Sequence, residues 1–244
     1  MSAKSCRATR CTDARSNFKG VRQLEFERDV PAERDVPDAV LDRLDNLLSA
    51  DGFRQTLRGV YVRNLDKDWR AWIAVSGLPN LLLPNIGIYN EDVATIGRTA
   101  FAKVGRPNGN PPDTGPPLIM VGLERVIGDD ADCAQHMSWS HQNKKNATLE
   151  QLGTDAADDL YYCLKKKGYP FFADRMTFES ILAAGHNATA SPAFPHYFPV
   201  VLVKLGRRDD VPRYVQDYLR RIPYPELQQN YKGYVDALME VMGT

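Results

Sequence analysis

Apolar residues recur at helical spacing near the beginning of the folded part of the chain. They fall at i, i+1, i+4, i+7 and i+8, which places them on one face of a 3.6-residue period. These residues are Val40, Leu41, Leu44, Leu47 and Leu48. Pro37 suits a first helical turn and Gly52 suits a C-terminal cap, so the pattern predicts a helix over residues 37–50.

The next segments alternate apolar and polar residues with the period of a β-strand. The predicted strands are 57–63, 69–76, 81–89 and 118–126, with a shorter fifth strand near 137–140. Short polar connections between the first three predict an antiparallel meander. Pro84 suits a strand edge or a bulge, because proline cannot donate to a ladder. A helix is predicted over 91–104, and residues 105–117 form a loop rich in proline and glycine.

The rest of the chain returns to helical spacing. Predicted helices cover 148–166, 175–185, a segment around 198–205, 211–222 and 226–242. Gly168, Tyr169 and Pro170 are expected to end the first of them. The order of helix, strands and then helices is typical of the α+β class. We therefore predict an antiparallel sheet of about four to five strands packed with helices, followed by a helical C-terminal third.

This pattern divides the chain into an arm and one domain. Residues 1–36 are polar, and the sequence Glu-Arg-Asp-Val-Pro occurs at 27–31 and again at 33–37, across the end of this segment, which favours a mobile or loosely docked arm. Residues 37–244 are expected to form a single α+β domain. Its sheet-containing part is 37–145 and its helical part is 146–244.

Charge and hydropathy narrow the class of protein. The chain has 31 Lys and Arg and 31 Asp and Glu, so it lacks the basic excess typical of nucleic-acid binders. Its longest apolar runs are far shorter than the roughly 18 residues of a membrane span. The polar N-terminus has no apolar signal segment, so we expect a cytoplasmic protein with no membrane partner. The four cysteines are expected to be free thiols, and no cofactor is predicted.

Aromatic and arginine side chains on the predicted sheet give the first functional candidates. Trp69 and Trp72 have opposite strand parity, so one of them should face away from the core. The side with Arg70 and Trp72 is the less apolar, and such side chains are common in protein contacts. A C-terminal helix covering Trp72 is the alternative. The predicted binding residues are Arg70, Trp72, Tyr89 and Trp139.

Candidate catalytic groups support only an alternative to the binding function. The sequence lacks a phosphate-binding glycine loop, a Gly-x-Ser-x-Gly elbow and a His-Glu-x-x-His helix, and no catalytic residue is predicted. His136 and His141 lie five residues apart, and Asp113 and Glu124 supply carboxylates. A metal-dependent hydrolase or nuclease would use both histidines with Asp113 or Glu124, and it needs these groups to meet in one cleft.

The tyrosines of the C-terminal helices suggest a third class of function. If they line the surface, they would form the interface of a scaffold or oligomerisation module. If they cover other elements, that role loses its support. These residues are Tyr214, Tyr218, Tyr224, Tyr231 and Tyr234.

Residues of about 40–90 resemble a known family. The pattern comprises Gly52-Phe53, Tyr61-Val62-Arg63, Trp69-Arg70-Ala71-Trp72 with Ser76, and Asn85-Ile86-Gly87-Ile88-Tyr89. It is similar to the bacterial family filed as domain of unknown function 4304. The resemblance implies a bacterial α+β domain and supplies no catalytic residues. By analogy with small bacterial domains of this kind, we expect a non-enzymatic protein-binding module, such as an immunity or defence-accessory protein.

Overall fold

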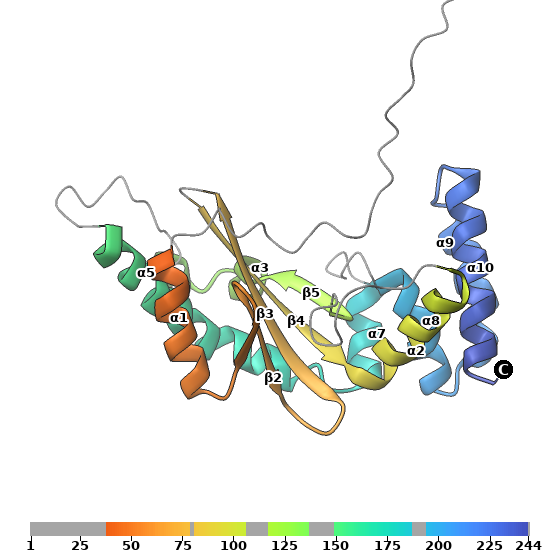
Figure 1. Ribbon diagram of the computed structural model, residues 1–244, viewed down its shortest axis with the longest axis horizontal. Helices are drawn as coiled ribbons and strands as arrows, with labels where there is room; N and C mark the ends of the chain where they lie inside the picture. Colours follow the sequence, from red (N-terminus) through yellow and green to blue (C-terminus); the bar gives the residue numbers. More distant parts are fainter. Residues whose placement is uncertain (1–37, 79–80, 106–116, 137–148, 187–193, 244) are drawn as a thin grey trace, which may run out of the picture. The chain divides into compact units, whose positions relative to one another are not determined.

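A five-stranded antiparallel sheet lies at the centre of the described part of the protein (Figure 1). The computed structural model describes residues 38–78, 81–105, 117–136, 149–186 and 194–243, all within the unit Pro31–Thr244. The strands are β1 (Arg54–Leu57), β2 (Val60–Asn64), β3 (Trp69–Leu78), β4 (Leu81–Asn90) and β5 (Ile119–Gly122). They are neighbours in chain order, with every pair antiparallel, so the predicted meander is confirmed.

Helices precede the sheet, interrupt it once and then make up the remainder of the described residues. The first two are α1 (Asp38–Ala50) and α2 (Glu91–Lys103), followed after β5 by α3 (Leu123–Ile127) and α4 (Ala131–His136). Then come α5 (Leu149–Cys163), the π-helical segment η1 (Leu164–Gly168), α6 (Tyr169–Ala173) and α7 (Phe178–His186). The last are α8 (Phe194–Lys204), the short 3-10 helix η2 (Arg208–Asp210), α9 (Val211–Leu219) and α10 (Pro225–Val241). The predicted α+β class with a helical C-terminal part is confirmed.

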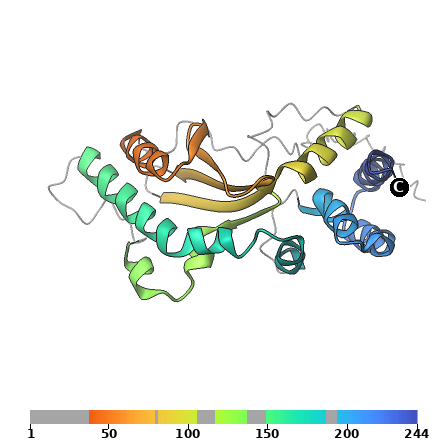
Figure 2. The same ribbon diagram turned by 90° about the horizontal axis from the view of Figure 1, so that it is seen from below.

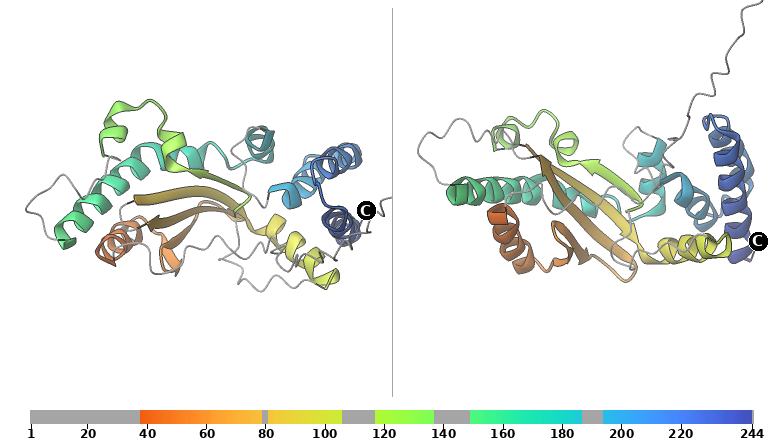
Figure 3. Two further views of the ribbon diagram at one scale, coloured as in Figure 1. Left: turned by 90° about the horizontal axis from the view of Figure 1, so that it is seen from above. Right: turned by 45° about the horizontal axis from the view of Figure 1, so that its top comes forward.

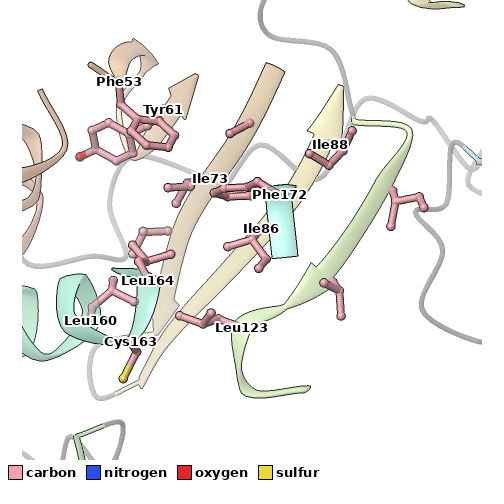
Figure 4. Close-up of a cluster of buried hydrophobic side chains, with 14 of the residues drawn as sticks. Phe53, Tyr61, Ile73, Ile86, Ile88, Leu123, Leu160, Cys163, Leu164 and Phe172 are labelled. Carbon is pink, nitrogen blue, oxygen red and sulfur yellow. The ribbon is translucent and has the colours of Figure 1, made fainter. Parts of the chain in front are cut away.

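The main hydrophobic core lies against one face of the sheet. On β3 the alternate residues Ala71, Ile73 and Val75 are buried in it, as the strand period requires. Side chains from α5, η1 and α6 pack among the strand residues (Figure 4), with Phe172 fully buried. Figure 2 shows α5 running beside the strands, and α1 contacts α5. The apolar stripe predicted for the first helix is thus the surface that α1 buries.

A second core joins α2 to the C-terminal helices (Figure 3). Its buried residues come mainly from α2, α8 and α10, and α9 contributes partly buried side chains. Gly97 lies inside α2, and its lack of a side chain makes room for this contact. A Cβ at that position would lie 3.1 Å from Cε1 of the Tyr197 ring.

Pro84 lies in the part of β4 that does not pair with β5. Within the described ranges, β5 pairs with β4 only from Asn85 to Ile88, so this part of the sheet has an edge at Pro84. Leu118 N donates to Ile88 O at 2.8 Å, so alternate residues of β4 direct their backbone groups to the β5 side. Pro84 has the same parity as Ile88, and its missing N–H therefore removes no ladder bond. The predicted edge position is confirmed.

Two of the predicted strands differ from those observed. The run 57–63 contains a turn, because Gly59 takes a φ of 76° and separates β1 from β2. The run 118–126 is a strand only as far as Gly122 and then becomes α3. Leu123 and Ile127 lie four residues apart on one helical face, and both are buried. The predicted strand at 137–140 and the predicted arm lie outside the described residues.

The expected helix end at residues 168–170 is wrong. Gly168 keeps helical dihedral angles, φ −68° and ψ −44°, and the chain passes through η1 directly into α6. Pro170 lies in the first turn of α6, so its missing N–H falls at the junction between the π-helical segment and the following α-helix. The glycine and the proline therefore mark a change of helix type.

Candidate functional site

Four polar side chains meet where β3, β4 and α2 join. Arg70 and Tyr89 are opposite one another in the β3–β4 register. Glu91 Oε2 lies 3.1 Å from Arg70 Nη1, and Glu91 Oε1 accepts a hydrogen bond from Arg98 Nη2 at 2.8 Å. Arg98 Nη1 donates to the Tyr89 hydroxyl at 2.7 Å. We call Arg70, Tyr89, Glu91 and Arg98 the arginine cluster.

Local sequence explains why these groups converge. Asn90 ends β4 and caps α2, because its side-chain oxygen accepts a hydrogen bond from Val93 N at 3.1 Å. Glu91 is therefore the first residue of the helix, beside the end of the strand that carries Tyr89. Arg98 follows Glu91 by seven residues, two helical turns, so both side chains lie on one face.

The cluster combines opposite charges in a partly desolvated place. The exposed fractions of the side chains are 21% for Arg70, 27% for Glu91 and 24% for Arg98. Burial would lower the pKa of Arg98, but the hydrogen bonds with Glu91 and Tyr89 outweigh it and raise that pKa. Burial also raises the pKa of Tyr89, against the opposing charge of Arg98. The cluster is thus two charged guanidinium groups, one carboxylate and one protonated phenol.

The structure brings together two of the four predicted binding residues, Arg70 and Tyr89. Trp72 lies two residues from Arg70 on β3, and only 6% of it is exposed. Among its hydrophobic neighbours in the described part of the chain, none comes from a C-terminal helix. Its neighbours in that part of the chain come from the strands: Val60, Val62, Ala74 and Met120. Trp139 lies outside the described residues.

Trp72 nevertheless occupies an unusual position. In the register it is opposite Gly87, where a Cβ would come within 2.6 Å of Pro117 Cγ. Glycine is therefore needed beside the indole so that Pro117 can lie on this face of the sheet. The indole N–H is buried and has no hydrogen-bond acceptor among the described residues. A binding role for Trp72 stays a prediction.

The described residues do not bring the ligands of the alternative metal site together. Glu124 lies in the first turn of α3 with an exposed side chain, and His136 is the last residue of α4. His141 and Asp113 lie outside the described residues. Within the described ranges, no group of three or more His, Cys, Asp or Glu side chains is placed to hold a metal ion. The metal-dependent reaction stays a prediction from sequence.

A second polar cluster surrounds Asp51, which the sequence did not single out. The hydroxyls of Tyr161 and Tyr169 donate to Asp51 Oδ2 at 2.7 and 2.5 Å, and Lys165 Nζ lies 3.2 Å from each carboxylate oxygen. Burial would raise the pKa of Asp51, but the hydrogen bonds from Tyr169, Tyr161 and Lys165 outweigh it and hold the pKa below its usual value. The carboxylate connects the end of α1 to α5, η1 and α6.

The lysines of η1 are bound in the same way on another side. Lys166 Nζ lies 3.0 Å from Asp130 and 2.8 Å from Asp132, and Lys167 Nζ lies 2.8 Å from Asp130. Asp130 also accepts a hydrogen bond from Cys133 N at 3.1 Å and so caps α4. In the sequence, the run of three lysines is the feature that could have pointed to this group of ion pairs. π-Helical turns are frequent at functional sites, but here the lysines bind carboxylates of the same chain.

Most of the C-terminal tyrosines point inward. Tyr231 and Tyr234 are buried, and their hydroxyls donate to Pro195 O at 2.7 Å and His196 O at 3.0 Å. Tyr214 and Tyr218 are partly buried, whereas Tyr224 is 49% exposed. These side chains pack among the C-terminal helices, and only Tyr224 presents a large exposed surface. The interface expected of a scaffold therefore lacks four of its five tyrosines.

Several residues of the family-like pattern have packing roles. Gly52 takes a φ of 81° after α1, and Phe53 is buried against Tyr169 and Phe172. The Arg63 guanidinium lies 4.7 Å from the Phe53 ring centre and 4.6 Å from that of Tyr169. These positions stabilise the fold, so on their own they indicate no activity.

Comparison with known proteins adds no family to this picture. No protein-family model, no curated protein and no solved structure matches the chain. The resemblance in residues 40–90 therefore rests on the sequence pattern alone. Among the described helices, none is long and apolar enough to cross a membrane.

Proposed function

We propose that this chain is a non-enzymatic module that binds another protein at the arginine cluster. The placement of Arg98 is the main support for this proposal. Its guanidinium is fixed by hydrogen bonds to Tyr89, Glu91 and Thr95, yet about a quarter of the side chain is exposed. Arg70 lies on the other side of Glu91, so two guanidinium groups are presented together.

Such an arrangement suits recognition for an energetic reason. Ordering a long side chain at an interface costs about 0.5–1.5 kcal/mol, and here the order exists before a partner arrives. Arginine and tyrosine are also enriched among the residues that contribute most to protein interfaces. A partner that contacts Arg98 therefore gains a charged contact at a reduced entropic cost.

An immunity or defence-accessory role is the specific form of the proposal. It rests on the resemblance of residues 40–90 to a bacterial family, and it means that binding blocks or assists the partner. The arginine cluster supports the binding part, since Arg70 and Tyr89 lie inside the resembling segment and Glu91 and Arg98 lie in the helix that follows it. The scaffold alternative is less favoured, because its tyrosines are largely used inside the protein.

The proposal is tested by capture followed by reconstitution. The tagged full chain, an Arg98→Gln variant and an Arg213→Gln control are used to capture partners from the native host. Arg213 is an exposed arginine of α9 outside the cluster, so the control removes the same charge. A captured protein is then purified, and its affinity for each variant is measured by calorimetry.

We expect one protein to bind the wild type and the control at a fixed ratio. Loss of Arg98 is expected to weaken binding by about 2 kcal/mol or more, roughly 30-fold, as for a central interface arginine. Equal affinity of all three proteins would place the interface elsewhere. Thermal unfolding of each variant shows whether a loss of binding reflects a loss of structure.

A further inference from the structure

We infer that the group taken by the arginine cluster is a carboxylate of an acidic segment in the partner, and that Glu91 occupies its place until the partner binds. This inference rests on the proposed function and names the chemistry of its partner. Glu91 is the residue that shows the geometry, because its two carboxylate oxygens face different guanidinium groups.

The distances show that the cluster already accepts one carboxylate. Oε1 lies 2.8 Å from Arg98 Nη2, and Oε2 lies 3.1 Å from Arg70 Nη1. A guanidinium presents a planar set of N–H donors that matches the two oxygens of a carboxylate. The spacing between Arg70 and Arg98 is therefore set for a carboxylate that bridges them.

The internal carboxylate satisfies this place only in part. Glu91 Oε2 is buried and, among the described residues, accepts no hydrogen bond, although it forms an ion pair with Arg70. A buried oxygen without a hydrogen bond loses its hydration without full replacement. A partner carboxylate that accepts from both guanidinium groups would replace the Arg98–Glu91 hydrogen bond and would add the hydrogen bond to Arg70 that Glu91 Oε2 does not make.

Charge favours the incoming group as well. The cluster holds two guanidinium groups and one carboxylate, and the neighbouring Asp92 is already paired with Lys204. The positive end of the α2 dipole lies at the same place and also favours an anion. A nucleic-acid phosphate is the less suitable anion, because the chain has no net positive charge to attract a polyanion over distance.

The test uses a labelled hexaglutamate peptide, followed by fluorescence anisotropy at low ionic strength. A hexaglutamine peptide is the uncharged control, and single-stranded oligothymidylate tests phosphate. The proteins are the wild type, Glu91→Gln, Arg98→Gln, Arg98→Lys and the Arg213→Gln control, each checked by thermal unfolding. Arg98→Lys keeps the charge and removes the planar donor set, so it reports on geometry if Arg98→Gln is poorly folded.

We expect hexaglutamate to bind the wild type and the control alike. Glu91→Gln should bind it about threefold or more tightly, because the internal competitor is removed, and Arg98→Gln about tenfold more weakly. No hexaglutamate binding, unchanged binding by Glu91→Gln, or tighter binding of oligothymidylate would overturn the inference. If a captured protein depends on Arg98 while hexaglutamate fails to bind, the carboxylate inference is wrong and the proposed function stands.

Discussion

The hydroxyl of Tyr231 is expected to stabilise the protein by repairing a defect that Pro199 creates. Pro199 lies inside α8 and has no N–H, so the carbonyl of Pro195, four residues earlier, loses its intrahelical donor. Tyr231 from α10 donates to that carbonyl at 2.7 Å. Tyr231→Phe keeps the ring and removes this donor, together with the hydrogen bond between the Tyr231 and Tyr214 hydroxyls.

The size of the effect follows from the cost of an unpaired polar group. Leaving a partly buried carbonyl without a donor costs about 1–3 kcal/mol, so Tyr231→Phe should lower the free energy of unfolding by that amount. In a Pro199→Ala background, the new backbone N–H can bond to Pro195 O. The same loss of the hydroxyl should then cost less than about half as much.

Urea denaturation of the four proteins of this double-mutant cycle measures the difference. The slope of the free energy with urea should be unchanged among them, so that the midpoints report stability. An equal cost of Tyr231→Phe in both backgrounds would refute the reasoning, since Tyr231 would then act independently of Pro199. Tyr234→Phe is a matched control, because His196 O, its acceptor, does not depend on Pro199 for its helical donor.

Three further predictions concern acidity and packing. Burial lowers the pKa of His196 from 6.5 to about 4, so the unfolded chain binds a proton at a higher pH than the folded protein does. The free energy of unfolding should therefore fall by up to about 3 kcal/mol as the pH drops from 6.5 to 4. Denaturation of His196→Phe at several pH values should show that this pH dependence is removed. The pKa of Asp51 lies below its usual 3.8, so its contribution is present above that pH and is lost as the pH falls through the lower folded value. Asp51→Asn should flatten this acid limb in thermal melts, and an unchanged limb would contradict the assigned contacts. Gly153→Ala should destabilise the protein by about 1 kcal/mol or more despite alanine's higher helix propensity, since the new Cβ would lie 2.8 Å from Ala39 Cβ, and Ala39→Gly should restore part of the loss in urea denaturation.

Part of the candidate site could be found before the structure was known. Strand parity places Arg70 on the less apolar face of its strand, and the β3–β4 register places the predicted Tyr89 opposite it. Glu91 and Arg98 were missed, because charged pairs two helical turns apart are common on exposed helix faces and do not indicate a site by themselves. The burial of Trp72 was uncertain for a similar reason, since strand parity assigns a side chain to a face without saying what covers that face.

The sequence by itself determined the kinds of elements and their order, because the period of apolar residues records which face of each helix or strand avoids water. It therefore predicted the α+β class and the antiparallel meander. Only the tertiary structure decided the polar contacts, since Asp51 meets Tyr169 across 118 positions and Tyr231 meets Pro195 across 36. Periodicity shows that a face is buried, but it does not show which element covers that face. A hydrogen bond forms only when the donor and acceptor atoms of the two elements are placed to within a few tenths of an ångström.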